Sequence, residues 1–170
     1  MTDTADETPF DDLITANRSF AQAFALARLD GVARAGVAMV TCMDSRIDPL
    51  AMIGLAPGDA KILRTPGGRL TDPAFVGLVL AVNLLQVERV LVVQHTRCAM
   101  SSATEQQLSD RLSEASRKDA SWMSLGVITD RLASITDDVH KLRAHPLVPS
   151  SVAVGGFVYD VDTGLLGPVT

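Results

Sequence analysis

Short apolar runs alternate with longer segments of helical periodicity along this chain. Four runs have the length of strands and contain many Val, Ile and Leu residues: 36–42, 60–65, 88–94 and 151–159. The last six residues are typical of an edge strand. Because the runs are apolar throughout, they predict strands that are covered on both faces of a sheet.

Segments with apolar residues at helical spacing separate these runs. The predicted helices are 11–30, 71–85, about 101–118 and about 125–144, with a short helix near 48–53. Pro66-Gly67-Gly68 predicts a tight turn after the second strand. Strands that alternate with helices predict an α/β fold, in which a mostly parallel four-stranded sheet with an added edge strand carries helices on both faces.

The length of 170 residues and a hydrophobic content of 47% fit one domain. Five of the 20 acidic residues lie among the first twelve, which leaves 15 acids against 15 bases elsewhere. We therefore expect 1–10 to be a disordered acidic arm and 11–170 to be a single domain. A neutral body argues against nucleic acid or an anionic membrane as partner. With no signal peptide and no apolar run of about 18 residues, a cytoplasmic location is expected.

Candidate metal ligands follow two of the predicted strands. Cys42 ends the first strand, His95 follows the third, and Cys98 comes three residues later. Parallel sheets bind ligands beyond the carboxyl ends of their strands, and a strand order of 2-1-3-4 brings these three residues to one crevice. Two thiolates and one imidazole suit tetrahedral zinc and leave a fourth position open, as catalytic zinc requires. Two buried, inert thiols are the alternative.

An acid and a base lie just past the first cysteine. Asp44 and Arg46 can form an ion pair beside the metal. Asp44 can then accept a hydrogen bond from a zinc-bound water, or occupy the fourth position itself and switch the site off. The alternative is an exposed salt bridge worth about 0–1 kcal/mol.

Three segments resemble the signature blocks of the β-class carbonic anhydrases. They are C-M-D-S-R at 42–46, R-T-P-G-G-R at 64–69 and H-T-R-C-A-M at 95–100. Their order and spacing are similar to those of the family over about residues 10–165. The compact size and the ending G-F-V-Y-D-V-D-T-G-L-L at 156–166 resemble its short bacterial subgroup.

The resemblance implies a zinc enzyme that interconverts CO₂ and bicarbonate. Cys42, His95 and Cys98 are then the zinc ligands. Asp44 and Arg46 are the catalytic dyad, which orients the zinc-bound hydroxide in an open state, and Asp44 ligates the zinc in a closed state. The family forms homodimers or dimers of dimers, with an N-terminal helix, here 11–30, gripping the partner.

The same blocks depart from the family pattern at four positions. Arg97 stands where the family has an acid, Ala99 where it has glycine, and Thr65 and Pro66 replace the usual N-A of R-N-A-G-G. Arg97 is expected to compete with Arg46 for Asp44 or to disturb His95. Ala99 is unfavourable if its backbone needs a positive φ, and Thr65 and Pro66 alter the pocket wall.

Other function classes stay open at this point. The same zinc site can hydrolyse COS or CS₂, or it can belong to a silent or bicarbonate-sensing relative that Asp44 keeps closed. A metal-free alternative makes Cys42 a nucleophile with His95 as its base. Of the remaining residues, His140 and His145 are expected at the surface, with His145 at a helix end, and Trp122 is expected to pack.

Overall fold

The computed structural model describes residues 8–169 and divides the chain into two units, Met1–Asp30 and Gly31–Thr170. Most of the predicted acidic arm, residues 1–7, lies outside the described residues. Within the described part, no helix is long and apolar enough to cross a membrane.

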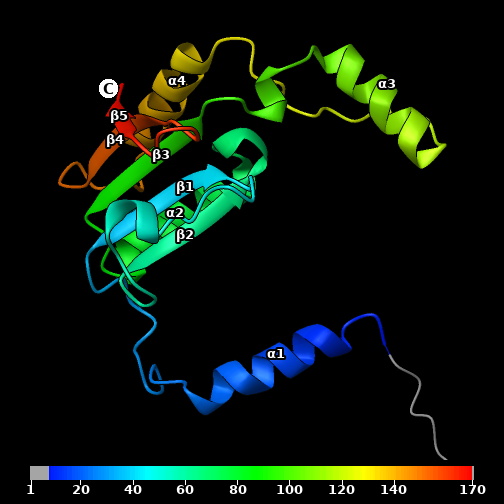
Figure 1. Cartoon of the computed structure of the whole chain (residues 1–170). Coiled ribbons are helices and arrows are strands. Elements are labelled where there is room, and N and C mark those ends of the chain that lie inside the picture. Colours follow the sequence, from blue (N-terminus) through cyan, green and yellow to red (C-terminus); the bar gives the residue numbers. More distant parts are fainter. Residues whose placement is uncertain (1–7, 170) are drawn as a thin grey trace, which may run out of the picture. The chain divides into compact units, whose positions relative to one another are not determined.

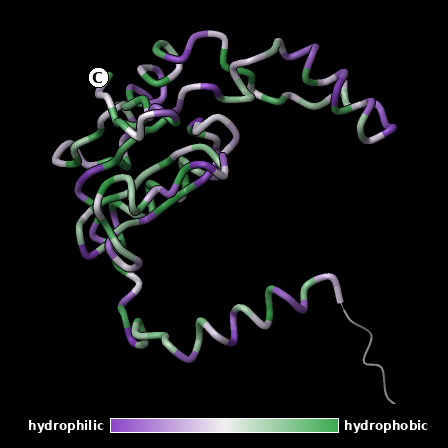
Figure 2. Tube along the Cα trace, viewed as in Figure 1, coloured by the Kyte–Doolittle hydropathy of each residue, from purple (hydrophilic) through white to green (hydrophobic). Residues whose placement is uncertain are grey.

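Residues 8–30 of the first unit contain one helix, α1 (Asp11–Gln22). Hydrophobic and hydrophilic residues alternate along it (Figure 2), and none of its residues is buried. The predicted helix 11–30 is too long, because α1 ends at Gln22 and the next residue, Ala23, has non-helical angles of φ −105° and ψ 11°. Arg28, with a left-handed φ of 71°, also excludes a continuous right-handed helix to residue 30.

The second unit is built on a five-stranded sheet with the order β2-β1-β3-β4-β5 (Figure 1). Its strands are β1 (Val37–Cys42), β2 (Ala60–Thr65), β3 (Arg89–His95), β4 (Ala153–Tyr159) and β5 (Leu166–Pro168). The first four pair in parallel, and β5 pairs with β4 in antiparallel. The predicted α/β class, strand order and edge strand are confirmed.

Three α-helices and three short 3₁₀ helices connect the strands. They are η1 (Ala51–Ile53), η2 (Pro66–Gly68), α2 (Asp72–Leu84), η3 (Ala99–Ser101), α3 (Glu105–Ser116) and α4 (Arg131–Ala144). Thr104 opens α3 with a capping box and Asp130 caps α4, so both helices begin later than predicted. Trp122, between them, is 76% exposed, and the prediction that it packs is wrong.

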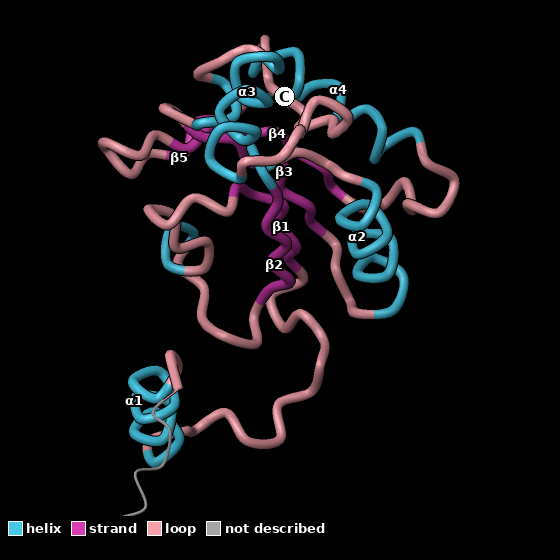
Figure 3. The backbone as a smooth tube through the Cα atoms, turned by 90° about the vertical axis from the view of Figure 1, so that its right-hand side faces the viewer, coloured by secondary structure: helices cyan, strands magenta, loops and turns pink. Residues whose placement is uncertain are grey.

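The main core lies between the sheet and two helices. Leu78 of α2 and Ile135 and Val139 of α4 pack with Val40 and Val92 of the sheet. Figure 3 shows α2 alongside strands β1 and β2. At the carboxyl ends of the neighbouring strands β1 and β3, Thr41 pairs with Val93. The sheet therefore presents the ends of these two strands side by side, which is where the candidate ligands lie.

Candidate metal centre

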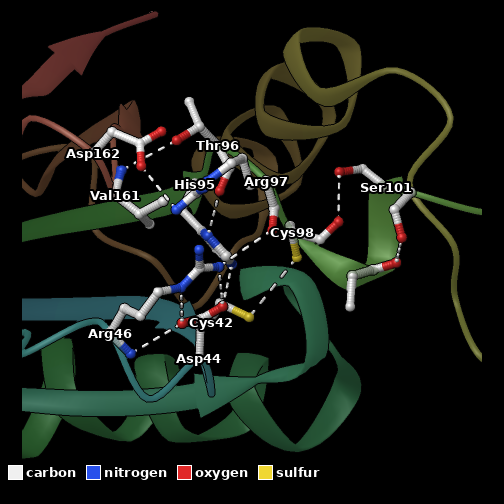
Figure 4. A network of polar contacts seen from close by, with 12 residues as sticks. Cys42, Asp44, Arg46, His95, Thr96, Arg97, Cys98, Ser101, Val161 and Asp162 are labelled. Atoms are coloured by element: carbon white, nitrogen blue, oxygen red, sulfur yellow. Dashed lines mark hydrogen bonds and ion pairs between the residues drawn. The ribbon is translucent and has the colours of Figure 1, made fainter.

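Three buried side chains converge at the ends of β1 and β3 (Figure 4). Cys42 is the last residue of β1, His95 is the last residue of β3, and Cys98 stands just before η3. One potential ligand atom from each lies within 4.8 Å of the other two, and the two Sγ atoms are 4.0 Å apart. Two thiols and an imidazole at these separations can share one metal ion.

The imidazole of His95 is oriented by its own loop. Its Nδ1 lies 2.8 Å from the carbonyl oxygen of Thr96 and donates to it. Nε2 is buried and has no hydrogen-bond partner among the described residues. An unpaired buried nitrogen is costly unless something binds it, and this Nε2 has its lone pair free for a metal.

The donor set fits zinc. Zinc bonds sulfur at about 2.3 Å, so two sulfurs on one tetrahedral ion lie about 3.8 Å apart. The observed Sγ–Sγ distance of 4.0 Å is close to that value. The three residues could therefore hold zinc and leave its fourth position open.

The two neighbouring thiols shift each other's pKa in opposite directions. A hydrogen bond from Cys98, with a smaller contribution from His95, lowers the pKa of Cys42 to about 4 against the opposing effect of burial. The hydrogen bond to Cys42, together with burial, raises the pKa of Cys98. Binding of a metal ion by both sulfurs displaces the protons that they still carry.

Asp44 lies beside this cluster and is held by Arg46. Its carboxylate accepts hydrogen bonds from Arg46 Nε at 2.9 Å, Nη2 at 2.7 Å and the backbone N–H at 3.0 Å. These contacts hold the pKa of Asp44 well below its usual range. Asp44 Oδ2 is also 3.8 Å from Nε2 of His95. An ionised acceptor therefore stands at the edge of the candidate metal site.

Arg64 fixes the backbone on which these groups stand, and the sequence analysis missed it. From the end of β2, its Nε donates to the carbonyl oxygen of Cys42 at 3.0 Å and its Nη2 to that of Asp44 at 2.5 Å. It lies one residue from the end of a strand adjacent to β1. An arginine at that position could have been recognised as a neighbour of the site. Its contact with the Asp44 carbonyl, however, depends on the conformation of the loop after β1, which the sequence does not reveal.

The four residues that differ from the family pattern each have a defined environment in the structure. Arg97 does not compete for Asp44, because its side chain pairs with Asp162 at 2.8 Å instead. Ala99 has no positive φ, whereas Arg97 does. Thr65 donates its hydroxyl to the carbonyl oxygen of Arg69 at 2.7 Å, and Pro66 begins η2. Arg97 therefore leaves Asp44 to Arg46.

The other histidines lie away from the cluster. His140 is exposed on α4, and His145 is the C-cap of that helix, with its ring against Phe75. His140 lies at the surface as expected, whereas His145 lies at the expected helix end but is half-buried.

A family model described as carbonic anhydrase matches residues 37–166. The chain belongs to the β-carbonic anhydrase family. The matched residues include the three candidate ligands and Asp44 and Arg46. The resemblance noted from the sequence is confirmed.

Similar proteins include both carbonic anhydrases and carbon disulfide hydrolases. Beta-carbonic anhydrase 1 of Mycobacterium tuberculosis is 28% identical over 134 residues, covering 79% of this chain and 82% of the relative. A carbon disulfide hydrolase of Acidianus sp. is 31% identical over 166 residues, covering 82% and 80%. The crystal structure of a Streptococcus mutans carbonic anhydrase matches with a TM-score of 0.87 and 35% identity, covering 96% and 99%.

The low pKa of Asp44 predicts how its contribution to stability depends on pH. Because the folded pKa lies below the unfolded value of about 3.9, the contribution is present above that value and is lost as the pH falls below it. In metal-free protein, the difference in the free energy of unfolding between wild type and Asp44→Asn should be constant from about pH 8 to pH 5 and shrink below about pH 4. Urea denaturation across this range measures it. A difference that stays constant down to pH 3 would contradict the assigned ion pair.

Proposed function

We propose that the chain catalyses the reversible hydration of CO₂ to bicarbonate and a proton at a zinc ion held by Cys42, His95 and Cys98. The observation that carries this proposal is the buried cluster of these three ligand atoms beside the Asp44–Arg46 pair. Membership of the β-carbonic anhydrase family supports the same reaction.

The chain's own residues prepare the site in two ways. The hydrogen bond from His95 Nδ1 to the Thr96 carbonyl directs Nε2 at the metal position. Cys42 and Cys98, once both are deprotonated, would supply two negative charges that neutralise a divalent ion. Zinc bound there supplies Lewis acidity, which lowers the pKa of a bound water.

Asp44 and Arg46 form the proposed catalytic dyad. Arg46 keeps the carboxylate ionised and restricts its rotation through both carboxylate oxygens. Asp44 Oδ2 can therefore accept a hydrogen bond from a donor at the open side of the site and orient that donor toward CO₂. In a closed state, Asp44 would leave Arg46 and serve as a further ligand of the zinc. In the present structure it lies on Arg46.

Hydrolysis of CS₂ or COS is the second candidate function. A relative named carbon disulfide hydrolase, at 31% identity, favours it. Attack by a water-derived nucleophile on a linear heterocumulene needs the same groups, so access to the site decides between the substrates.

A substrate panel on zinc-loaded protein tests the proposal. Stopped-flow hydration of CO₂ and hydrolysis of COS and CS₂ should be measured on one preparation from about pH 6.5 to 9. We expect CO₂ to be the fastest substrate, with a rate that rises with pH. CS₂ as the fastest substrate would move the assignment to a hydrolase. Zinc-loaded protein that is inactive on all three up to pH 9 would favour the silent or sensing relative.

The metal-free cysteine nucleophile has its own test. Cys42 is only 5% exposed, and its sulfur lies against Cys98. If zinc holds this sulfur, iodoacetamide should label Cys42 slowly until a chelator is added. Labelling that a chelator does not change would favour the nucleophile.

We also propose that the protein is a homodimer, or a dimer of dimers, in the cytoplasm. The support is α1, which carries large apolar side chains and has no buried residue. Leu13 and Phe20 on this helix, and Phe24 beyond its end, are each 48–62% exposed. Large apolar side chains left exposed along one short segment need a partner surface, and a second copy supplies one.

A charge placed among these apolar side chains of α1 is predicted to break the dimer. Phe20→Asp should weaken dimerisation by about 100-fold, since an unpaired charge in an apolar interface is strongly unfavourable. Ser19→Asp, about a third of a turn away, is the matched control and should keep the wild-type association. Sedimentation equilibrium measures both. A monomeric wild type, or equal dimerisation of both variants, would contradict the proposal.

A further inference from the structure

The loop that carries two candidate zinc ligands is fastened to the turn that follows β4. The N–H of Thr96 donates to the carbonyl oxygen of Tyr159 at 2.9 Å. The N–H of Val161 donates to the hydroxyl oxygen of Thr96 at 3.1 Å. These bonds place the backbone of His95–Cys98 against residues 159–162, which lie about 65 residues further along the chain.

Arg97 adds a charged contact to this junction. Its Nη2 lies 2.8 Å from Oδ1 of Asp162, and the two side chains are 60% and 56% exposed. Asp162 is itself held in place, because its N–H donates to Oδ1 of Asp160 at 2.8 Å. The junction is therefore closed by a backbone bond, a hydroxyl and one ion pair.

The backbone of Arg97 faces the dyad. Its φ of 52° is left-handed, which is uncommon for a residue with a long side chain. In this conformation, the carbonyl oxygen of Arg97 accepts a hydrogen bond from Arg46 Nη2 at 3.2 Å, while its side chain reaches Asp162 (Figure 4). The same Nη2 of Arg46 binds Asp44 Oδ2. One residue thus links the turn after β4 to the Asp44–Arg46 pair.

We propose that Arg97 and Asp162 are positioning residues of this enzyme: their ion pair holds the Arg97 peptide where its carbonyl oxygen anchors Arg46, and Arg46 in turn holds Asp44. The inference rests on the proposed function. An exposed ion pair adds little to global stability, so its effect is local. A displaced catalytic group lowers the rate even when the fold is intact.

The role of this ion pair predicts whether the hydration rate rises or falls when Arg97 is replaced by the acid that the family has at this position. Arg97→Asp puts a second carboxylate next to Asp162, so the loop is repelled from the turn and the hydration rate falls. An arginine that competes with Arg46 for Asp44 predicts the opposite, because its removal would raise the rate.

A charge-swap series on the full-length, zinc-loaded protein tests the pair. The single variants are Arg97→Gln, Asp162→Asn and Arg97→Lys, and the double variant is Arg97→Asp with Asp162→Arg. Gln and Lys, like Arg, are not branched at Cβ, so the cost of the left-handed backbone at residue 97 should be similar in wild type and in both variants. Arg34→Gln is the control, since Arg34 forms an equally short ion pair with Asp59, at 2.7 Å, and is likewise exposed. That pair lies before β1 and β2, at the opposite ends of the strands.

Two readouts are needed. The first is kcat and KM for CO₂. The second is hydrogen exchange at the amides of Thr96 and Val161, which donate across the junction and report its opening without any activity.

Arg97→Gln and Asp162→Asn should each lower kcat about two- to fivefold with KM almost unchanged, and both amides should exchange faster by a similar factor. Arg97→Lys and the charge-swapped double variant should recover most of both values, and Arg34→Gln should match wild type. Unchanged kcat and exchange in the two neutral variants, or a double variant no better than the single ones, would overturn the inference. If wild-type protein loaded with zinc does not hydrate CO₂, the proposed function fails, and the exchange data alone then decide whether the pair fastens the loop.

Discussion

Replacing Cys98 with serine is expected to remove zinc and to abolish CO₂ hydration. A serine hydroxyl is a poor zinc ligand at neutral pH, and only Cys42 and His95 would remain. Loss of residues that merely orient zinc ligands costs about 10–100-fold, so loss of a ligand should lower the rate by more than about 100-fold. Zinc per chain, measured by atomic absorption, and stopped-flow hydration report the two effects.

Ser101→Ala is the matched control for Cys98→Ser. The Ser101 hydroxyl donates to the carbonyl oxygen of Cys98 at 3.1 Å, so the control alters the same loop without touching a sulfur. It should retain one zinc per chain and most of the activity. A Cys98→Ser protein that keeps its zinc and hydrates CO₂ at the wild-type rate would remove Cys98 from the ligand set.

The second large effect is expected from Gly68→Ala. Gly68 has a φ of 69°, and a Cβ there would lie 2.5 Å from the carbonyl oxygen of Val93 and 3.1 Å from the backbone nitrogen of Cys42. The first contact lies two residues before His95 in β3 and the second is the backbone of Cys42 itself, so neither atom can move without displacing a candidate ligand. We expect a loss of about 3 kcal/mol or more in the free energy of unfolding, together with weaker zinc binding.

Gly126→Ala separates the two causes of that loss in stability, which are the left-handed backbone and the steric clash of the new Cβ. Gly126 has a similar φ of 73°, but a Cβ there meets nothing within 4 Å. Gly126→Ala should lower the free energy of unfolding by only about 1 kcal/mol, the cost of placing alanine in a left-handed backbone conformation. Urea denaturation of both variants measures the difference. Equal losses would mean that the close approach of Gly68 to the strand ends has no energetic weight.

Local pattern predicted the sheet well because its strands are dense apolar runs. The run 88–94 was found almost to the residue as β3, and the order of the strands followed from placing Cys42 and His95 at neighbouring strand ends. The end of α1 was missed, since the apolar spacing continues past Gln22 while the backbone does not stay helical. Trp122 was placed in the core on its residue type alone, and it is exposed.

The candidate ligands were predictable for a related reason. Residues at the ends of parallel strands share one edge of the sheet, so their meeting depends only on strand order. The partner of Arg97 was not predictable in this way. Asp162 reaches it because His95 pairs with Tyr159 in the register of β3 and β4. That register pairs residues far apart in the sequence, so local patterns do not reveal it. The sequence indicates only that a polar segment, 160–164, follows the last apolar run.

A zinc titration of the metal-free protein, with CO₂ hydration followed by stopped flow at about pH 8, tests most directly whether this chain is a zinc-dependent carbonic anhydrase. No catalysis is expected before zinc is added. The rate should then rise in proportion to added zinc and level off at about one zinc per chain. Binding of one zinc per chain without any hydration, or hydration that does not depend on zinc, would contradict the proposed function.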